Sequence, residues 1–93
     1  MRPVKTTVIV EFRFDSIEEV IDFLKQPGTS VELEHNVCIY KLELTSSGNL
    51  VMLLKQDENG RLLDECECEE MDWDDEIFNI AECKGYLHLE KKA

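Results

Sequence analysis

The chain has 93 residues, of which 43% are hydrophobic and 33% are charged, and its formal net charge at pH 7 is −11. A chain of this length and composition makes a single domain, residues 1–93, with one modest core, and intrinsic disorder is not expected. The excess negative charge opposes direct binding to nucleic-acid phosphates or to an anionic membrane, so a macromolecular partner is expected to be basic.

The first predicted element is a strand over residues 5–14. Val8, Val10, Phe12 and Phe14 recur at every second position, which is the period of a half-buried strand rich in β-branched and aromatic residues. One face of this strand is therefore expected to pack on the core.

An amphipathic helix is predicted next, over residues 16–26. Asp15 and Ser16 each precede a glutamate by three residues, which offers a capping box in two registers. The apolar residues Ile17, Val20, Ile21 and Leu24 then recur at helical spacing, and Pro27-Gly28 ends the pattern.

A three-stranded antiparallel meander is predicted in the centre of the chain. Residues 38–44 and 50–57 are its first two strands, joined by Ser46-Ser47-Gly48-Asn49, and a brief extended piece at 31–34 precedes them. Asn59-Gly60 is a strong hairpin signal and predicts a third strand over 61–70. In that strand Leu62, Cys66 and Cys68 share one face, so the cysteines are interpreted as core residues.

Two structures fit residues 71–90. A helix over 74–83 would begin with an acidic turn, which the helix dipole favours. A final hairpin would turn at Lys84-Gly85 into a strand over 86–90. The predicted fold is therefore α+β: an N-terminal strand and one helix packed on a mainly antiparallel sheet, with a central meander and a C-terminal hairpin or short helix.

The acidic residues are concentrated in one segment. Between Arg61 and Lys84 there are ten acids and no base, whereas the other 71 residues carry eleven acids and ten bases. Like charges at neighbouring positions repel, and natural surfaces usually mix the two signs, so this arrangement calls for a reason. The ten acids are Asp64, Glu65, Glu67, Glu69, Glu70, Asp72, Asp74, Asp75, Glu76 and Glu82.

One hypothesis is that these carboxylates imitate the phosphates of a nucleic acid. On the predicted strand, Glu65, Glu67 and Glu69 would be spaced by roughly 6.6 Å, against one DNA charge per roughly 3.4 Å of axis on each strand. Aromatic side chains beside charges serve as interface anchors, which suggests Trp73 for that role. The predicted partner-binding residues are Glu65, Glu67, Glu69, Glu70, Asp72, Trp73, Asp74, Asp75 and Glu76.

A small acidic α+β domain with a carboxylate-rich face resembles, in composition, the phage-encoded inhibitors of bacterial defence nucleases, the DNA-mimic class that includes anti-restriction and anti-CRISPR proteins. No residue is carried over from that class. The resemblance implies an inhibitor that covers the basic surface of a nuclease or of another nucleic-acid-binding protein.

The alternative hypothesis is a structural or self-associating protein. Here an exposed strand edge pairs with a second copy as a homodimer, and the acids serve solubility and edge protection. This hypothesis predicts a dimer that salt strengthens, because salt screens the repulsion between two acidic chains.

Metal-binding and catalytic patterns are weak. Cys66 and Cys68 with Cys83 and His88 lack the paired spacing of structural zinc sites, and in the run that starts at Asp72 the sixth position of a calcium loop is Ile77 instead of glycine. No motif surrounds either histidine, and the glycines form no phosphate-binding loop. We therefore expect no metal, no cofactor and no enzymatic activity.

The chain is expected to be cytoplasmic. It shows no secretory signal and no apolar run long enough to span a membrane. The four cysteines, Cys38, Cys66, Cys68 and Cys83, are then expected to be free thiols.

Overall fold

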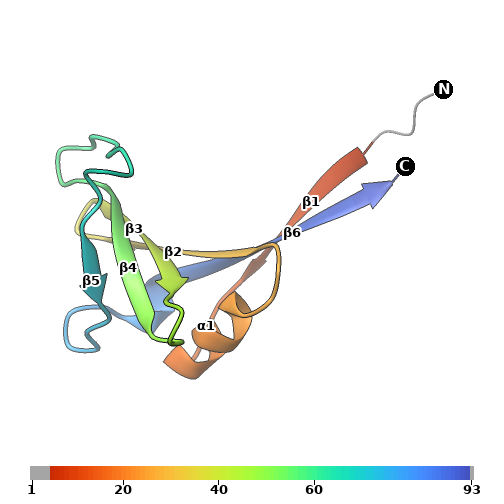
Figure 1. Ribbon diagram of the computed structural model, residues 1–93, viewed down its shortest axis with the longest axis horizontal. Helices are drawn as coiled ribbons and strands as arrows, with labels where there is room; N and C mark the ends of the chain where they lie inside the picture. The colour runs from red at the N-terminus through yellow and green to blue at the C-terminus, as the bar shows by residue number, and fades with distance from the viewer. Residues whose placement is uncertain (1–4, 93) are drawn as a thin grey trace.

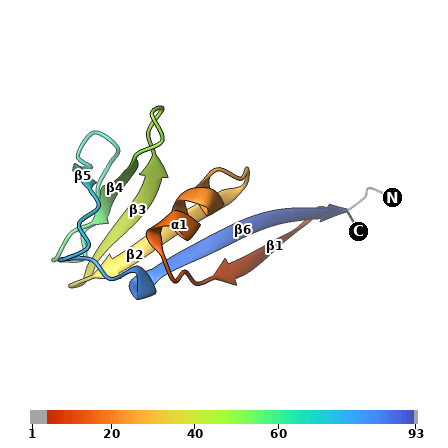
Figure 2. The same ribbon diagram turned by 90° about the horizontal axis from the view of Figure 1, so that it is seen from below.

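The computed structural model describes residues 5–92 and shows one helix on a six-stranded antiparallel sheet, with strand order β1-β6-β2-β3-β4-β5 (Figures 1 and 2). This is the predicted α+β class. The elements are β1 (Lys5–Phe12), α1 (Ile17–Leu24), β2 (Thr29–His35), β3 (Cys38–Leu44), β4 (Leu50–Gln56), β5 (Glu70–Asp72), the short 3₁₀-helix η1 (Ile80–Glu82) and β6 (Cys83–Lys92).

Helix α1 begins and ends where the sequence predicts, within one or two residues. The Ser16 hydroxyl accepts a hydrogen bond from the Glu19 backbone N–H (3.3 Å), and the Glu19 carboxylate accepts one from the Asp15 N–H (2.8 Å). This reciprocal arrangement satisfies two N–H groups at the start of the helix. The helix buries Val20 and Phe23 on the sheet and ends before Pro27.

The core lies between α1 and one face of the sheet. Val31, Leu33, Leu42 and Met52 have no exposed surface and come from the three adjacent strands β2, β3 and β4. Val31 and Leu33 are two residues apart on β2, and Val31 lies opposite Leu42, which lies opposite Met52, so all four side chains share one face of the sheet.

The central strands confirm the predicted meander, with one addition. The strands at 38–44 and 50–57 are present as β3 and β4. The brief extended piece at 31–34 is instead a seven-residue strand, β2, between β6 and β3. A two-residue turn with positive φ at Asn36 (48°) and Val37 (71°) joins β2 to β3, which are the signs of φ that a type I′ hairpin turn requires.

The predicted strand over 61–70 is wrong. Only an isolated bridge between Gln56 and Leu62 extends the pairing after the Asn59-Gly60 turn. The chain then forms a separate turn, and strand pairing resumes over the three residues of β5. The interpretation of its cysteines as core residues is also wrong: Cys66 is exposed and Cys68 is half-buried. The alternation of apolar and acidic residues matched the period of a strand, but the apolar positions are not buried against a core.

The C-terminal segment also differs from both predicted alternatives. Residues 74–83 contain a turn and the three-residue η1 instead of a helix. Lys84-Gly85 is not a turn, because it lies inside the single ten-residue strand β6. Gly85 is needed there for packing: a Cβ atom at this position would lie 2.8 Å from Phe14 Cε2 and 2.9 Å from Phe23 Cε2. A glycine selected for close approach of two rings therefore gave a false turn signal.

Strands β1 and β6 form a ribbon that projects from the body of the protein (Figures 1 and 2). They pair from Lys5↔Lys92 to Phe12↔Gly85, whereas the pairing of β6 with β2 covers only Cys83 to Leu87. The outer half of the ribbon thus has two strands and no third neighbour among the described residues, and the longest dimension of the molecule reaches 52 Å.

Candidate functional site

The acidic segment folds as two turns on either side of β5, at the sheet edge opposite β1 (Figures 1 and 2). In the first turn the Asp64 carbonyl accepts hydrogen bonds from the N–H groups of Glu67 (2.9 Å) and Cys68 (3.1 Å). In the second the Asp74 carbonyl accepts from Ile77 (3.1 Å) and Phe78 (2.9 Å). We call β5 and these two turns, residues 64–78, the acidic surface.

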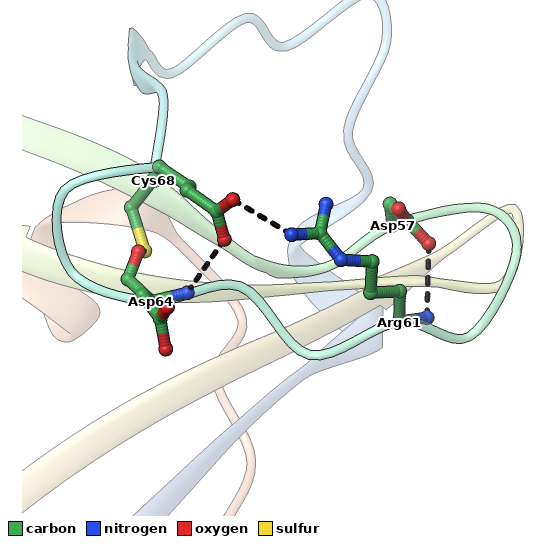
Figure 3. Close-up of polar contacts among 5 residues, drawn as sticks. Asp57, Arg61, Asp64 and Cys68 are labelled. Atoms are coloured by element: carbon green, nitrogen blue, oxygen red, sulfur yellow. Dashed lines mark hydrogen bonds and ion pairs between the residues drawn. The ribbon is translucent and has the colours of Figure 1, made fainter.

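The first turn is held by an arginine on the preceding loop (Figure 3). Arg61 Nη2 donates to Glu67 Oε1 at 2.7 Å, and Glu67 Oε2 accepts from the Asp64 N–H at 3.2 Å. The hydrogen bond from Arg61 holds the pKa of Glu67 below its usual value, with the Asp64 N–H acting in the same direction. Arg61 is itself positioned by its own backbone N–H, which donates to the Asp57 carboxylate (2.9 Å). Glu67 therefore stabilises the turn as well as adding charge to it.

The second turn is fixed to the core by aromatic side chains. Phe78 is buried, and its ring centroid lies 5.8 Å from that of Trp73, 5.5 Å from Tyr40 and 5.3 Å from His35. Trp73 Nε1 donates to the Asp75 carboxylate, and the Asp74 carboxylate accepts from the Glu76 N–H at 2.9 Å. The second turn is therefore held in place by packing and hydrogen bonds, even though most of its residues are exposed.

Trp73 is less accessible than the sequence suggests for an interface anchor. It is half-buried and packs against the core cluster. The apolar side chains that the region does expose are Leu62 (74% exposed), Ile77 (55%) and Met71 (37%). Nothing in the sequence pattern distinguishes Ile77, which is exposed, from its neighbour Phe78, which is buried.

The carboxylates do not form the predicted line along a strand face, because Glu65 and Glu67 lie in a turn. Two residues of β5, Glu70 and Asp72, do keep the two-residue spacing of one strand face. Among the side chains of residues 8–89, no hydrogen bond or ion pair engages the carboxylates of six exposed acids of this segment: Asp64, Glu65, Glu69, Glu70, Asp72 and Glu76.

The other candidate sites do not assemble. No three side chains of histidine, cysteine, aspartate or glutamate converge as metal ligands within the described part of the chain. The four residues considered for zinc have different environments. Cys66 is exposed and Cys83 is buried. The Cys68 Sγ–H donates a hydrogen bond to the Asp64 carbonyl (3.3 Å), and His88 is on the ribbon. Burial, with Glu82 adding to it, raises the pKa of the Cys83 thiol to about 11.

The hollows on the surface are small. One beside Glu32, Glu34 and Lys84 has a volume of about 130 Å³, and another beside Thr29 and Lys41 about 280 Å³. Small-molecule sites usually enclose about 300 to 1,000 Å³ and are mainly apolar. Neither hollow has that character.

No family model matches the chain, and no curated protein or solved structure matches it significantly. In the described residues no helix is long and apolar enough to cross a membrane. The functional argument therefore rests on the residues of the acidic surface and their geometry.

Proposed function

We propose that the acidic surface binds a basic surface of a nucleic-acid-handling protein and thereby inhibits it by imitating the charge of a nucleic acid. The observation that carries the proposal is the set of six unengaged, exposed carboxylates on β5 and its flanking turns, in a segment that has no base between Arg61 and Lys84. Such a surface attracts arginine and lysine side chains over several ångströms and speeds the encounter with a basic partner.

The exposed apolar side chains of the same region support a protein partner over a free cation. Ile77 projects from the second turn, and Met71 lies on β5 beside the buried Met52, on the strand face opposite that of Glu70 and Asp72. Interfaces commonly combine a few apolar anchors with surrounding charges. Leu62, Met71 and Ile77 are thus proposed as anchors, with Trp73 contributing mainly by holding the second turn.

The two turns present charge on a rigid support. The first is fixed by the Arg61–Glu67 ion pair and the second by Phe78 in the core. Binding would therefore cost little ordering of the backbone, and preorganisation of this kind raises affinity.

A charge-matched pair of variants tests the proposal. The first replaces five of the six unengaged acids by their amides: Glu65→Gln, Glu69→Gln, Glu70→Gln, Asp72→Asn and Glu76→Gln. The control changes five exposed acids elsewhere, with the same effect on net charge: Glu18→Gln, Asp22→Asn, Glu32→Gln, Glu34→Gln and Glu58→Gln.

The proteins are used as bait in a bacterial lysate, and captured proteins are challenged with double-stranded DNA and with salt. The wild type and the control variant are expected to retain a nucleic-acid-binding protein that DNA displaces, whereas the surface variant loses it. If both variants lose the partner to the same extent, net charge alone matters. Capture that DNA does not displace would refute mimicry.

A second role for two of these acids is edge protection. Strand β5 is an open edge of the sheet, and both Glu70 and Asp72 lie on it. Charged residues on an edge strand discourage pairing with other chains. This role is compatible with partner binding.

A further inference from the structure

The second open edge of the sheet, β1, is longer than β5 and has an apolar centre where β5 has two acids. Its pairing with β6 runs without a bulge from Lys5 to Phe12, and its centre is Val8-Ile9-Val10. It contains no proline, and its charged residues, Lys5 and Glu11, lie towards its ends. An edge of this kind is a template for pairing with another strand.

The ribbon also leaves apolar surface uncovered. Ile9 is 59% exposed, Leu89 is 40% exposed and Phe12 is 38% exposed. Two-stranded ribbons are marginally stable in water, and a third strand or a packed face is normally needed. A strand added to the free edge of β1 would supply the missing neighbour.

We propose that this strand is β1 of a second copy, so that two chains form a symmetric antiparallel dimer centred on Val8. In a two-fold pairing of this kind, residues directly opposite each other must lie on the same face of the sheet. The symmetry axis must therefore pass beside a residue opposite itself, which leaves a short series of registers.

Charge selects one register from the series. Centring on Val8 places Lys5 of each chain opposite Glu11 of the other, by their positions along β1. Within β1, centring on Ile9 would place Glu11 opposite Thr7 and leave Lys5 without an opposite residue, and centring on Val10 would place Glu11 opposite Ile9 and again leave Lys5 unpaired. Cross-strand pairs of opposite charge stabilise a sheet and like charges destabilise it, so the Val8 register is favoured at both ends.

The dimer goes beyond the proposed partner binding and does not depend on it. Pairing through β1 joins the two sheets into one and extends the apolar ribbon face of Val8, Val10 and Leu89 across the axis. The acidic surface lies at the opposite edge of each sheet. Both copies of that surface would remain open at the two ends of the dimer.

Charge reversal provides the first test, with dimer dissociation measured by sedimentation at one ionic strength. Lys5→Glu and Glu11→Lys should each weaken the homodimer by on the order of tenfold or more, because each creates two like-charge pairs. Mixing the two variants should restore a heterodimer, since both end positions are then opposite in charge. The double variant Lys5→Glu/Glu11→Lys should restore the homodimer.

A wild-type chain that stays monomeric at its highest soluble concentration would overturn the proposal. A dimer whose dissociation is unchanged by either single reversal, or whose heterodimer is not restored, would overturn it as well. Neither result would bear on the acidic surface, whose variants leave β1 intact.

Cysteine placement provides the second test and reads the register directly. In a background with Cys38, Cys66 and Cys68 changed to serine, single cysteines are introduced at Val8, Ile9 or Val10. Opposite residues of antiparallel strands have Cα atoms about 4.5 to 5.5 Å apart, which suits a disulfide. Only Val8→Cys is expected to give a rapid intermolecular disulfide; preferential crosslinking by Ile9→Cys or Val10→Cys would refute the register.

Discussion

The two open edges of the sheet are built on opposite principles. The β5 edge is three residues long, carries Glu70 and Asp72, and is flanked by turns rich in acids. The β1 edge is eight residues long, has an apolar centre and exposes Ile9. Both present unpaired backbone groups to solvent, so the difference lies in what surrounds those groups.

The contrast suggests that the acids of β5 and the apolar centre of β1 have different purposes. A short, charged edge resists the addition of a strand, whereas a long, regular, apolar edge invites it. The acidic surface is thereby reserved for partners recognised through side chains, and β1 is left for a partner recognised through its backbone. Three further experiments test this distinction.

The largest expected effect on stability is at Gly85, where the ribbon joins the body. Gly85→Ala would force its Cβ against the rings of Phe14 and Phe23, and overpacking of this kind typically costs about 1 to 3 kcal/mol. The free energy of unfolding, measured with urea, should fall accordingly, and amide exchange should rise first in β1 and β6.

A double-mutant cycle with Phe14→Leu controls for other causes of that loss. The smaller side chain makes room for the added methyl group, so the double variant should lose less stability than the two single changes together. Strict additivity would show that crowding by Phe14 is not the cause.

The next effect is the dependence of stability on alkaline pH. The pKa of the Cys83 thiol is raised from 9.0 to about 11 by burial and by Glu82. A raised pKa in the folded state means that the protonated thiol favours folding. The contribution, roughly 2 kcal/mol, is therefore complete below pH 9 and is lost as pH rises towards 11.

Cys83→Ala isolates this contribution from other groups, including Tyr40, whose pKa is also raised, chiefly by burial. The variant should be less stable near neutrality but should lose less further stability between pH 9 and pH 11. Because Cys83 opens β6, the alkaline loosening should reach β1 and β6 before β5. Parallel pH curves for wild type and variant would contradict this account.

The smallest expected effect on stability, but an informative one, comes from removing charge at β5. Glu70→Thr with Asp72→Thr raises β propensity and should change stability by roughly 0.5 kcal/mol. It should also open this edge to pairing, so light scattering should detect assemblies larger than those of the wild type. The control Glu18→Gln/Asp22→Asn makes the same change in net charge on α1 and should not enlarge the assemblies.

The elements that the sequence predicts well are those whose pattern and burial agree. Helix α1 has a capping serine, an apolar stripe and a terminating proline, and β3 and β4 each supply buried residues to the core. The segment over 61–70 also alternates, yet its apolar positions have no core to pack on, and it forms a turn. Periodicity predicts a strand only where one of the two faces is buried.

The candidate site shows the same division. Sequence alone located the acidic segment, because charge is a property of composition. Which carboxylates are engaged depended on contacts between distant residues, such as Arg61 with Glu67, and the exposure of Ile77 depended on how Phe78 docks in the core. Single-residue properties cannot reveal these contacts.

Local periodicity, capping and composition are enough to predict the α+β class, the helix, the central strands and the concentration of negative charge. The strand order, the placement of β6 between β1 and β2, and hence the two edges that stay open are known only from the folded chain. Strand order depends on pairing between residues far apart in the chain, as between Phe12 and Gly85. The packing role of Gly85 likewise depends on the rings of Phe14 and Phe23, which only the fold brings against it.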